Sequence, residues 1–185
     1  MASLTTYDLT RVHPLENQLF AANNVLLKPV AAHTRMILRA GADQVETVGG
    51  IVGIVLPTLP KTSTSNGPRT VLWLGPDEWL VLEKSKSNLH KLPKKLADTQ
   101  CSVVDVSHRN TAILLSGKSV EQVLATGCPQ NLSLDIFPVG ACTRTVLGKS
   151  EIILLRTSIN TFHIECWRSF SEYVWKYLVD GIKSL

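Results

Sequence analysis

Short apolar segments alternate with turns along most of this chain, and several of the segments have a period of two. Residues 70–74 and 79–83 are two of them, and residues 75–78, Gly-Pro-Asp-Glu, separate them. The alternation predicts two strands, and the turn predicts a hairpin, because proline presets the backbone angle that its second position requires. Residues 141–147 and 151–156 predict a second hairpin.

The order of the segments indicates that the chain consists of two related halves. Residues 74–81 of the first hairpin are echoed by residues 147–154, and residues 25–41 align without gaps on residues 101–117. The identical positions of that alignment are Val30/Val106, Ile37/Ile113, Leu38/Leu114 and Gly41/Gly117. Because both segments recur in the same order, the sequence predicts a duplicated fold.

The first half reads as a strand, a helix, a loop, the hairpin and a second helix. The strand is predicted at 35–39, the first helix at 43–52 and a polar loop at 61–68. Two adjacent glycines weaken the first helix, since each costs about 1 kcal/mol relative to alanine. Leucines on one helical face predict the second helix near Pro93, which marks its start.

The second half follows the same plan with one additional strand. A strand is predicted at 112–115, a helix at 119–125 that a Gly-Cys-Pro sequence ends, and a loop at 130–138. Residues 160–166 form the strand without a counterpart in the first half. Their alternation of apolar and polar residues predicts one buried face and one solvated face, and His163 lies on the solvated face.

The last helix has the clearest predicted start. Ser169 and Glu172 have the spacing of a capping box, in which each side chain bonds a free backbone N–H at the beginning of the helix. A wide apolar face follows, made of Phe170, Tyr173, Val174, Trp175, Tyr177, Leu178, Val179 and Ile182. This face is wider than a simple surface helix needs.

Hairpins combined with two helices per half predict an α+β fold with antiparallel or mixed sheets. We expect two ferredoxin-like lobes in one compact unit, since no linker separates the halves. The expected divisions are an N-terminal arm at 1–24 with at most one short helix, a first α+β lobe at 25–100 and a second α+β lobe at 101–185.

Composition limits the classes of function. The chain has 185 residues, of which 44% are hydrophobic and 18% charged, as in ordinary globular proteins. The net charge of +4 is spread along the chain except for a lysine group at 84–95, which has no nucleic-acid reading motif and predicts a solvated helix face. No apolar stretch approaches the roughly 20 residues that cross a bilayer, and residues 1–20 lack the apolar core of a signal peptide. We therefore expect a cytoplasmic protein that binds neither nucleic acid nor membrane.

The residues that commonly hold metals and cofactors show no recognisable spacing. Cys101, Cys128, Cys142 and Cys166 form no C-x-x-C pair, so we expect free, mostly buried thiols and no zinc cage. The five histidines have no metal-ligand spacing, and no glycine-rich nucleotide motif occurs. The sequence therefore predicts no metal-binding and no cofactor-binding residue in this chain.

Two segments resemble catalytic sites at first sight. Asp105, Ser107 and His108 are close in sequence, but a strand places Ser107 and His108 on opposite faces, so we expect a strand end in which Asp105 or Ser107 bonds nearby backbone N–H groups. Cys128 follows a helix end, where the partial negative charge of the helix disfavours a thiolate, so we expect it to be packed. No catalytic residue is predicted.

Large aromatic residues are the remaining candidates for a functional role. Trp73 and Trp79 flank the first turn, and Trp175 and Val179 widen the face of the last helix. Such residues belong either to the core or to the centre of a protein interface, where tryptophan is enriched. Both a core position and an interface position remain possible, and Trp73, Trp79, Trp175 and Val179 are the candidate subunit interface.

Several short motifs stand in order along both halves of the chain: Leu74-Gly75-Pro76-Asp77-Glu78-Trp79-Leu80-Val81, Asp105-Val106-Ser107-His108-Arg109, Ser116-Gly117, Thr126-Gly127-Cys128-Pro129, Phe137-Pro138-Val139-Gly140, Cys142-Thr143-Arg144 and Arg168-Ser169-Phe170. Together they resemble the gamma subunit family of heterotetrameric sarcosine oxidase, and the resemblance runs from about residue 34 to residue 182. The Asp-Val-Ser-His segment, followed by a strand and glycine, also resembles the aminomethyltransferase (glycine cleavage T-protein) folate-binding fold.

The resemblance implies a non-catalytic subunit in an assembly with alpha, beta and delta subunits. That assembly oxidatively demethylates sarcosine to glycine with release of hydrogen peroxide, and it passes the one-carbon unit to tetrahydrofolate. By the same resemblance the flavins FAD and FMN, NAD and the folate site belong to the alpha and beta subunits, and zinc belongs to the delta subunit. No catalytic or cofactor residue is transferred to this chain.

Two other functions are compatible with the predicted fold. One is a free-standing folate-dependent one-carbon transferase, for which 185 residues is short. The other is a regulatory module that binds a small molecule, because ferredoxin-like lobes often pair in such domains. Binding of folate by the isolated chain would favour the first, and stabilisation by a small ligand without a partner would favour the second.

Overall fold

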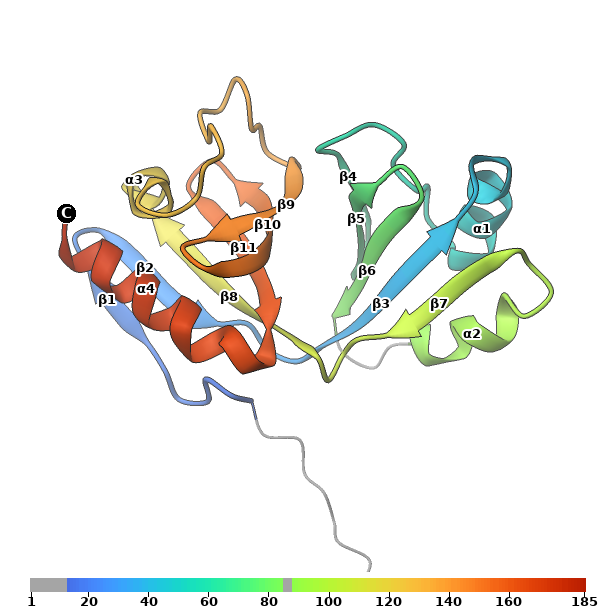
Figure 1. Cartoon of the computed structure of the whole chain (residues 1–185), viewed down its shortest axis with the longest axis horizontal. Helices are drawn as coiled ribbons and strands as arrows, with labels where there is room; N and C mark the ends of the chain where they lie inside the picture. Colours follow the sequence, from blue (N-terminus) through green and yellow to red (C-terminus); the bar gives the residue numbers. More distant parts are fainter. Residues whose placement is uncertain (1–12, 85–87) are drawn as a thin grey trace, which may run out of the picture.

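The computed structural model describes residues 13–84 and 88–185, and Figure 1 shows them as two lobes whose connecting segments cross at one end. Each lobe is a sheet with helices on its outer face. Residues 1–12 of the expected arm, and Lys86 of the lysine group, lie outside the described residues. No helix in the described part of the chain is long and apolar enough to cross a membrane.

The N-terminal lobe contains a five-stranded sheet in the order β4-β5-β6-β3-β7, in which all neighbours are antiparallel. Its strands are β3 (His33–Ala40), β4 (Ser63–Asn66), β5 (Arg69–Gly75), β6 (Glu78–Lys84) and β7 (Cys101–Asp105). Its helices are α1 (Val45–Val52), which a short 3-10 turn (Ala42–Gln44) precedes, and α2 (Leu92–Lys95), which a second 3-10 turn (Leu89–Lys91) precedes. Proline stands in the first turn of α2, where its missing N–H costs nothing.

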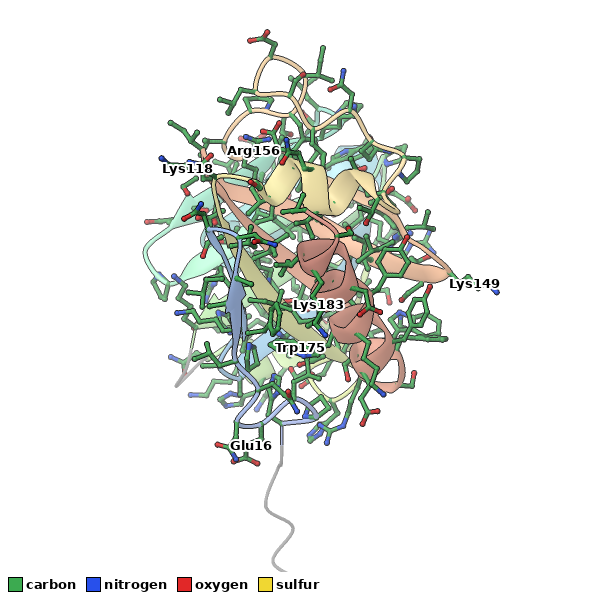
Figure 2. All side chains as sticks on the ribbon, turned by 90° about the vertical axis from the view of Figure 1, so that its left-hand side faces the viewer. Glu16, Lys118, Lys149, Arg156, Trp175 and Lys183 are labelled. Carbon is green, nitrogen blue, oxygen red and sulfur yellow. The ribbon has the colours of Figure 1, made fainter. Side chains whose placement is uncertain are left out.

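The C-terminal lobe contains a six-stranded antiparallel sheet in the order β1-β2-β8-β11-β10-β9. Its strands are β1 (Phe20–Ala22), β2 (Val25–Pro29), β8 (Asn110–Gly117), β9 (Cys142–Leu147), β10 (Ser150–Ser158) and β11 (Thr161–Trp167). Its helices are α3 (Val120–Ala125) and α4 (Ser171–Lys183), and a 3-10 turn (Arg168–Phe170) leads into α4. Figure 2 shows α3 and α4 together over this sheet, with Trp175 labelled on α4.

The two sheets have the same topology, which confirms the predicted duplication and the α+β class. The series β4-β5-β6-β3-β7 corresponds position by position to β9-β10-β11-β8-β2. The counterpart of the hairpin β5–β6 is therefore β10–β11, and the counterpart of β9 is β4. The sequence echo paired β5–β6 with β9–β10, which is wrong by one strand. The expectation that β11 has no counterpart is also wrong, because β11 corresponds to β6.

Each half contributes one strand to the sheet of the other half. β2 precedes β3 in the chain but pairs with β8, and β7 precedes β8 but pairs with β3. The connections cross where the lobes meet (Figure 1), and Val30 and Val106 donate backbone hydrogen bonds across the crossing to Ala112 and Arg35. The expected divisions at 25–100 and 101–185 are therefore corrected: the N-terminal lobe runs from β3 to β7, and β1 and β2 belong to the C-terminal lobe.

The core is divided among three apolar clusters. One lies beneath α1 and α2, one lies beneath α3 and α4, and the third lies between the two sheets. The third cluster includes Leu72 and Leu80 from the N-terminal sheet and Ile153 and Leu155 from the C-terminal sheet. Because the inner faces of both sheets are covered in this way, the lobes pack as helix, sheet, sheet and helix.

The structure differs from the sequence reading at four elements. Residues 61–68 were expected as a loop but contain β4, and the arm contains β1 and the buried Leu15. α4 begins at Ser171 after the 3-10 turn, and no side chain caps its start, so the expected capping box at Ser169 does not form. In β11 residues 162–166 are all buried, because the N-terminal lobe covers the face that was expected to be solvated.

Candidate functional site

The most buried polar cluster lies where β3 of one lobe meets β11 of the other. The Nε atom of Arg35 donates to Glu165 Oε2 at 2.7 Å, and the two side chains are 2% and 0% exposed. His163 Nε2 lies 2.7 Å from Glu165 Oε1, and the His163 ring meets the His33 ring edge-on at 6.1 Å between centroids. Since Glu165 and Arg35 come from different sheets, the cluster joins the lobes.

The cluster is electrostatically matched. Burial alone would raise the pKa of the Glu165 carboxyl, but the charge of Arg35 and the hydrogen bond from His163 lower it below its ordinary value. Glu165 is therefore ionised and accepts hydrogen bonds on both oxygens, so His163 Nε2 carries a proton. Burial is the main reason that the pKa of His33 lies below its ordinary value. The charges of Arg35 and Glu165 are therefore matched by each other, and their contact joins the two lobes.

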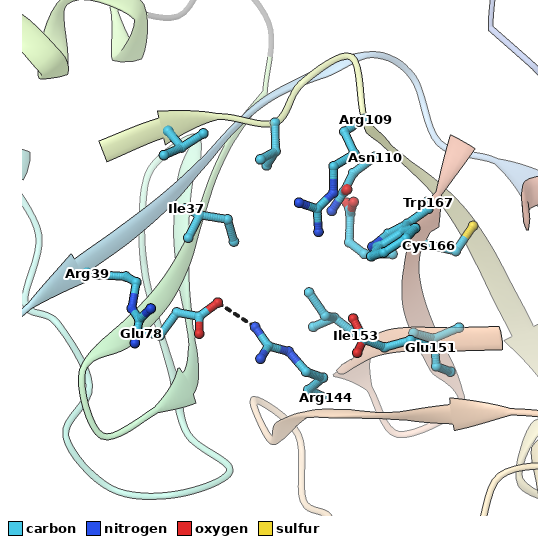
Figure 3. Close-up of a pocket in the computed structure, with 14 residues that line it drawn as sticks. Ile37, Arg39, Glu78, Arg109, Asn110, Arg144, Glu151, Ile153, Cys166 and Trp167 are labelled. Atoms are coloured by element: carbon cyan, nitrogen blue, oxygen red, sulfur yellow. Dashed lines mark hydrogen bonds and ion pairs between the residues drawn. The ribbon is translucent and has the colours of Figure 1, made fainter. Parts of the chain in front are cut away.

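A pocket of about 260 Å³ opens beside this cluster, between the lobes (Figure 3). Its wall combines Ile37 and Ile153 with charged groups that include Arg109, Arg144 and Glu151. Arg144 forms an ion pair with Glu78 across the lobes, shown by the dashed line in Figure 3. The pocket has the apolar wall and the few polar groups of a binding site. Cys166 and Glu165 also line it, but burial raises the pKa of the Cys166 thiol to about 12, and Glu165 is paired with Arg35.

The segment Asp105-Ser107-His108 adopts the expected strand end. The Ser107 N–H donates to Asp105 Oδ1 at 2.8 Å, and Ser107 Oγ accepts the backbone N–H of Arg35 at 2.9 Å. His108 is exposed, so the three side chains form no triad. The prediction that Asp105 and Ser107 bond nearby backbone N–H groups is confirmed, and these bonds fasten the crossing between the lobes.

The cysteines are free thiols in packed positions. Cys128, Cys142 and Cys166 are buried and Cys101 is partly buried. Burial raises the pKa of Cys142 to about 11, and burial together with the neighbouring Glu165 carboxylate raises the pKa of Cys166 to about 12. Thiols in this state are poor nucleophiles. Among residues 13–84 and 88–185, no three His, Cys, Asp or Glu side chains gather as metal ligands.

The four candidate interface residues have different positions. Trp79 is completely buried and its Nε1 donates to Pro57 O at 2.7 Å, so it is a core residue and the interface expectation for it is wrong. Trp175 is 7% exposed and belongs to the core beneath α4. Trp73 and Val179 are half-buried and retain some surface for a partner.

The sequence analysis did not identify the residues that join the lobes or that flank the pocket between them. Neither Arg35 nor Glu165 was singled out. Glu165 lies on the face of its strand that the alternation predicts to be solvated, and Arg35 was only the first residue of a predicted strand. Trp167 is 40% exposed and lies at the end of β11, yet it received no role. Its position before the Arg-Ser-Phe segment was the available signal.

The comparisons with known proteins agree with the resemblance of the motifs. Residues 39–183 match the sarcosine oxidase, gamma subunit family. The sarcosine oxidase subunit gamma of Corynebacterium sp. (strain P-1) is 30% identical over 98% of this chain and 96% of its own length. That of Corynebacterium sp. (strain U-96) is 30% identical over 85% of this chain and 79% of its own length.

Solved structures give the same result. One chain of the heterotetrameric sarcosine oxidase from Corynebacterium sp. U-96, in complex with pyrrole 2-carboxylate, matches with a TM-score of 0.85 and 27% identity over 94% of this chain and 95% of that chain. The glycine cleavage aminomethyltransferase T from Bartonella henselae matches with a TM-score of 0.63 and 14% identity, over 84% of this chain and 45% of that chain. The second match shows the aminomethyltransferase type of fold. The chain belongs to the sarcosine oxidase, gamma subunit family.

Proposed function

We propose that this chain is the gamma subunit of a heterotetrameric sarcosine oxidase and acts as a structural subunit of that enzyme. The observation that carries the proposal is the match over 94% of the chain to one chain of a heterotetrameric sarcosine oxidase. A partner assembly then supplies the chemistry. This chain supplies a rigid body that the larger subunits pack against.

A structural role is supported by how the polar groups of the chain are used. Arg35, Glu165 and His163 are buried and bond one another, and Ser107 is 7% exposed and bonds the backbone of Arg35. Arg156, with a fully buried side chain, is used in the same way: it pairs with Glu121, donates to Ile159 O at 2.8 Å and lies over the Phe162 ring. Arg156 Nη2 also donates to Leu132 O, so these contacts fix the lobes and the 130–138 loop. The buried polar groups named here are engaged with one another, which supports a structural role.

The proposal assigns the redox and transfer chemistry to partner subunits. FAD, FMN, NAD and tetrahydrofolate would be held by the alpha and beta subunits and zinc by the delta subunit, in a cytoplasmic enzyme that converts sarcosine to glycine. Among residues 13–84 and 88–185, the candidate ligands do not suit these groups: the thiols of Cys142 and Cys166 have raised pKa values, and the buried carboxylate of Glu165 is already paired with Arg35. A flavin held in its own subunit would supply the acceptor for the electrons of the substrate, and this chain would hold the shape of the assembly around it.

Co-expression with the alpha, beta and delta subunits tests the proposal. We expect the chain to co-purify with them in a fixed ratio. Without this chain, we expect the complex to be unstable and therefore to produce less hydrogen peroxide from sarcosine. A chain that remains a monodisperse monomer in the presence of all three subunits would contradict the proposal. Tight binding of tetrahydrofolate to the isolated chain, measured by calorimetry, would favour a one-carbon transferase instead.

A further inference from the structure

Trp167 is the most exposed of the four tryptophans. It is 40% exposed, whereas Trp79 and Trp175 are 0% and 7% exposed. Its ring lies 6.0 Å from the ring of Phe170, which is itself 43% exposed, and the guanidinium carbon of Arg109 lies 4.7 Å from its centroid. We call Trp167, Phe170 and Arg109 the Trp167 surface. Tryptophan, phenylalanine and arginine are the residue types enriched at the centres of protein interfaces.

The Trp167 surface lies between two depressions. Arg109 and Trp167 line the inter-lobe pocket of about 260 Å³ and also a second pocket of about 510 Å³. The second pocket is completed by Pro14 and by residues of the 3-10 turn and the first turn of α4, namely Arg168, Ser169, Ser171 and Glu172. Figure 3 shows Arg109 and Trp167 on the same side of the inter-lobe pocket. A ridge with a pocket on each side suits an extended protein segment whose side chains enter both.

The charge on this surface is unmatched within the described residues. Of the arginines that line the inter-lobe pocket, Arg39 pairs with Asp77 and Arg144 pairs with Glu78. Arg109 forms no ion pair with any residue of 13–84 or 88–185, and its guanidinium contacts the Trp167 ring instead. The adjacent Asn110 is 5% exposed, and its buried Oδ1 has no donor within the described chain. An unmatched guanidinium and an unmatched carbonyl oxygen at one pocket favour a partner that brings a carboxylate and an N–H donor.

We propose that the Trp167 surface is the site at which this chain docks on a larger subunit of its assembly. The partner contributes an acidic, apolar segment: an Asp or Glu carboxylate pairs with Arg109, an apolar side chain covers Trp167 and Phe170, and an N–H group reaches Asn110 Oδ1. This inference rests on the proposed function, because the occupant is a subunit of the same enzyme. It also replaces the buried Trp79 and Trp175 as the aromatic anchors of the interface.

The test compares variants in the complete assembly, formed by adding purified chain to the other subunits. Trp167→Ala and Arg109→Glu should each weaken incorporation of the chain by at least about tenfold, as expected for central interface residues. Arg109→Lys, which keeps the charge, should retain most of the affinity. Leu59→Ala and Lys118→Glu are matched controls at exposed positions outside both pockets and should assemble like the wild type.

A second measurement needs no variant. In hydroxyl-radical footprinting, Trp167 should be oxidised in the isolated chain and protected in the complex, whereas exposed Leu59 should react equally in both. If circular dichroism shows that a variant does not fold, the protection of Trp167 in the wild-type complex tests the docking site instead. Normal assembly of both variants, or equal oxidation of Trp167 in the two states, would overturn the docking site and leave the proposed function standing. If the wild-type chain does not assemble, the proposed function fails and the docking site fails with it.

Discussion

Arg35 and Glu165 illustrate how a single residue pair joins two sheets. A buried ion pair adds little to stability compared with apolar residues of the same shape, but removing one partner leaves an uncompensated charge in the interior. Glu165→Gln keeps the shape of the side chain and removes its charge. We expect this change to lower the free energy of unfolding by about 3 kcal/mol or more, measured by urea denaturation.

Asp77→Asn provides the matched control, because the Arg39–Asp77 pair is exposed, with side chains 57% and 51% accessible. An exposed pair contributes at most about 1 kcal/mol. If both variants lost the same small amount of stability, Arg35 would have to find another partner in the Glu165 variant, and the cluster would not join the lobes as described.

The same cluster makes stability depend on pH. The pKa of Glu165 lies below its ordinary value of 4.5 in the folded chain, and the pKa of His33 lies below its ordinary value of 6.5. In both cases the unfolded chain binds more protons as pH falls, so stability declines on acidification: below 6.5 through His33 and below 4.5 through Glu165.

We therefore expect Tm to fall steadily from neutral pH downward, with a steeper loss below about pH 4.5. Scanning calorimetry across this range measures it. Glu165→Gln should be less stable at neutral pH and should show a shallower acid slope. A wild-type Tm that stays constant or rises toward low pH would contradict the assigned directions.

At the scale of elements, the β1–β2 turn meets the end of β8 at Gly117. Gly117 has φ +138, and a Cβ atom there would lie 2.0 Å from Asn24 O. Gly117→Ala should therefore displace β2 from β8 and cost several kcal/mol, on the order of other severe backbone clashes. Gly50→Ala in α1 is the control, since a Cβ atom there meets nothing within 4 Å and alanine favours the helix. Chemical denaturation of both variants measures the difference, and equal stability would contradict the close approach.

The sequence predicted most elements but not which ones correspond. Strands rich in apolar residues, such as β5, β6 and β10, were found because both faces of each pack on apolar clusters. β4, with the sequence Ser-Thr-Ser-Asn, is an edge strand with no apolar face, so it read as a loop. Missing β4 shifted the alignment of the hairpins by one strand. The local pattern of apolar residues therefore identified the strands. Which strands of the two halves correspond follows only from how the strands pair in the sheets.

The candidate site was predictable only in part, for a similar reason. β11 alternates polar and apolar residues, so His163 and Glu165 were expected to face solvent. They are buried because the other lobe brings Arg35 to the same place. A buried charge needs a partner from elsewhere in the chain, and a single-strand pattern contains no information about that partner.

For the whole molecule, the exchange of β2 and β7 defines which fragments form complete sheets. A fragment of residues 33–105 contains all five strands of the N-terminal sheet, whereas a fragment of residues 25–100 contains β2 without β8 and lacks β7. We expect the first fragment to unfold cooperatively on heating and the second to show no cooperative transition, as followed by circular dichroism. Equal behaviour would mean that β7 is dispensable.

The exchanged strands also impose an order of events on the ribosome. β2 is synthesised early, but its neighbour β8 appears after the whole N-terminal sheet has been made. During that interval the N-terminal lobe can complete itself with β7, while Val25 and Leu27, both buried in the finished protein, have no sheet to join. The nascent chain therefore exposes the apolar, unpaired strand β2 until β8 has been synthesised. Slow or interrupted synthesis would prolong this exposure and favour aggregation.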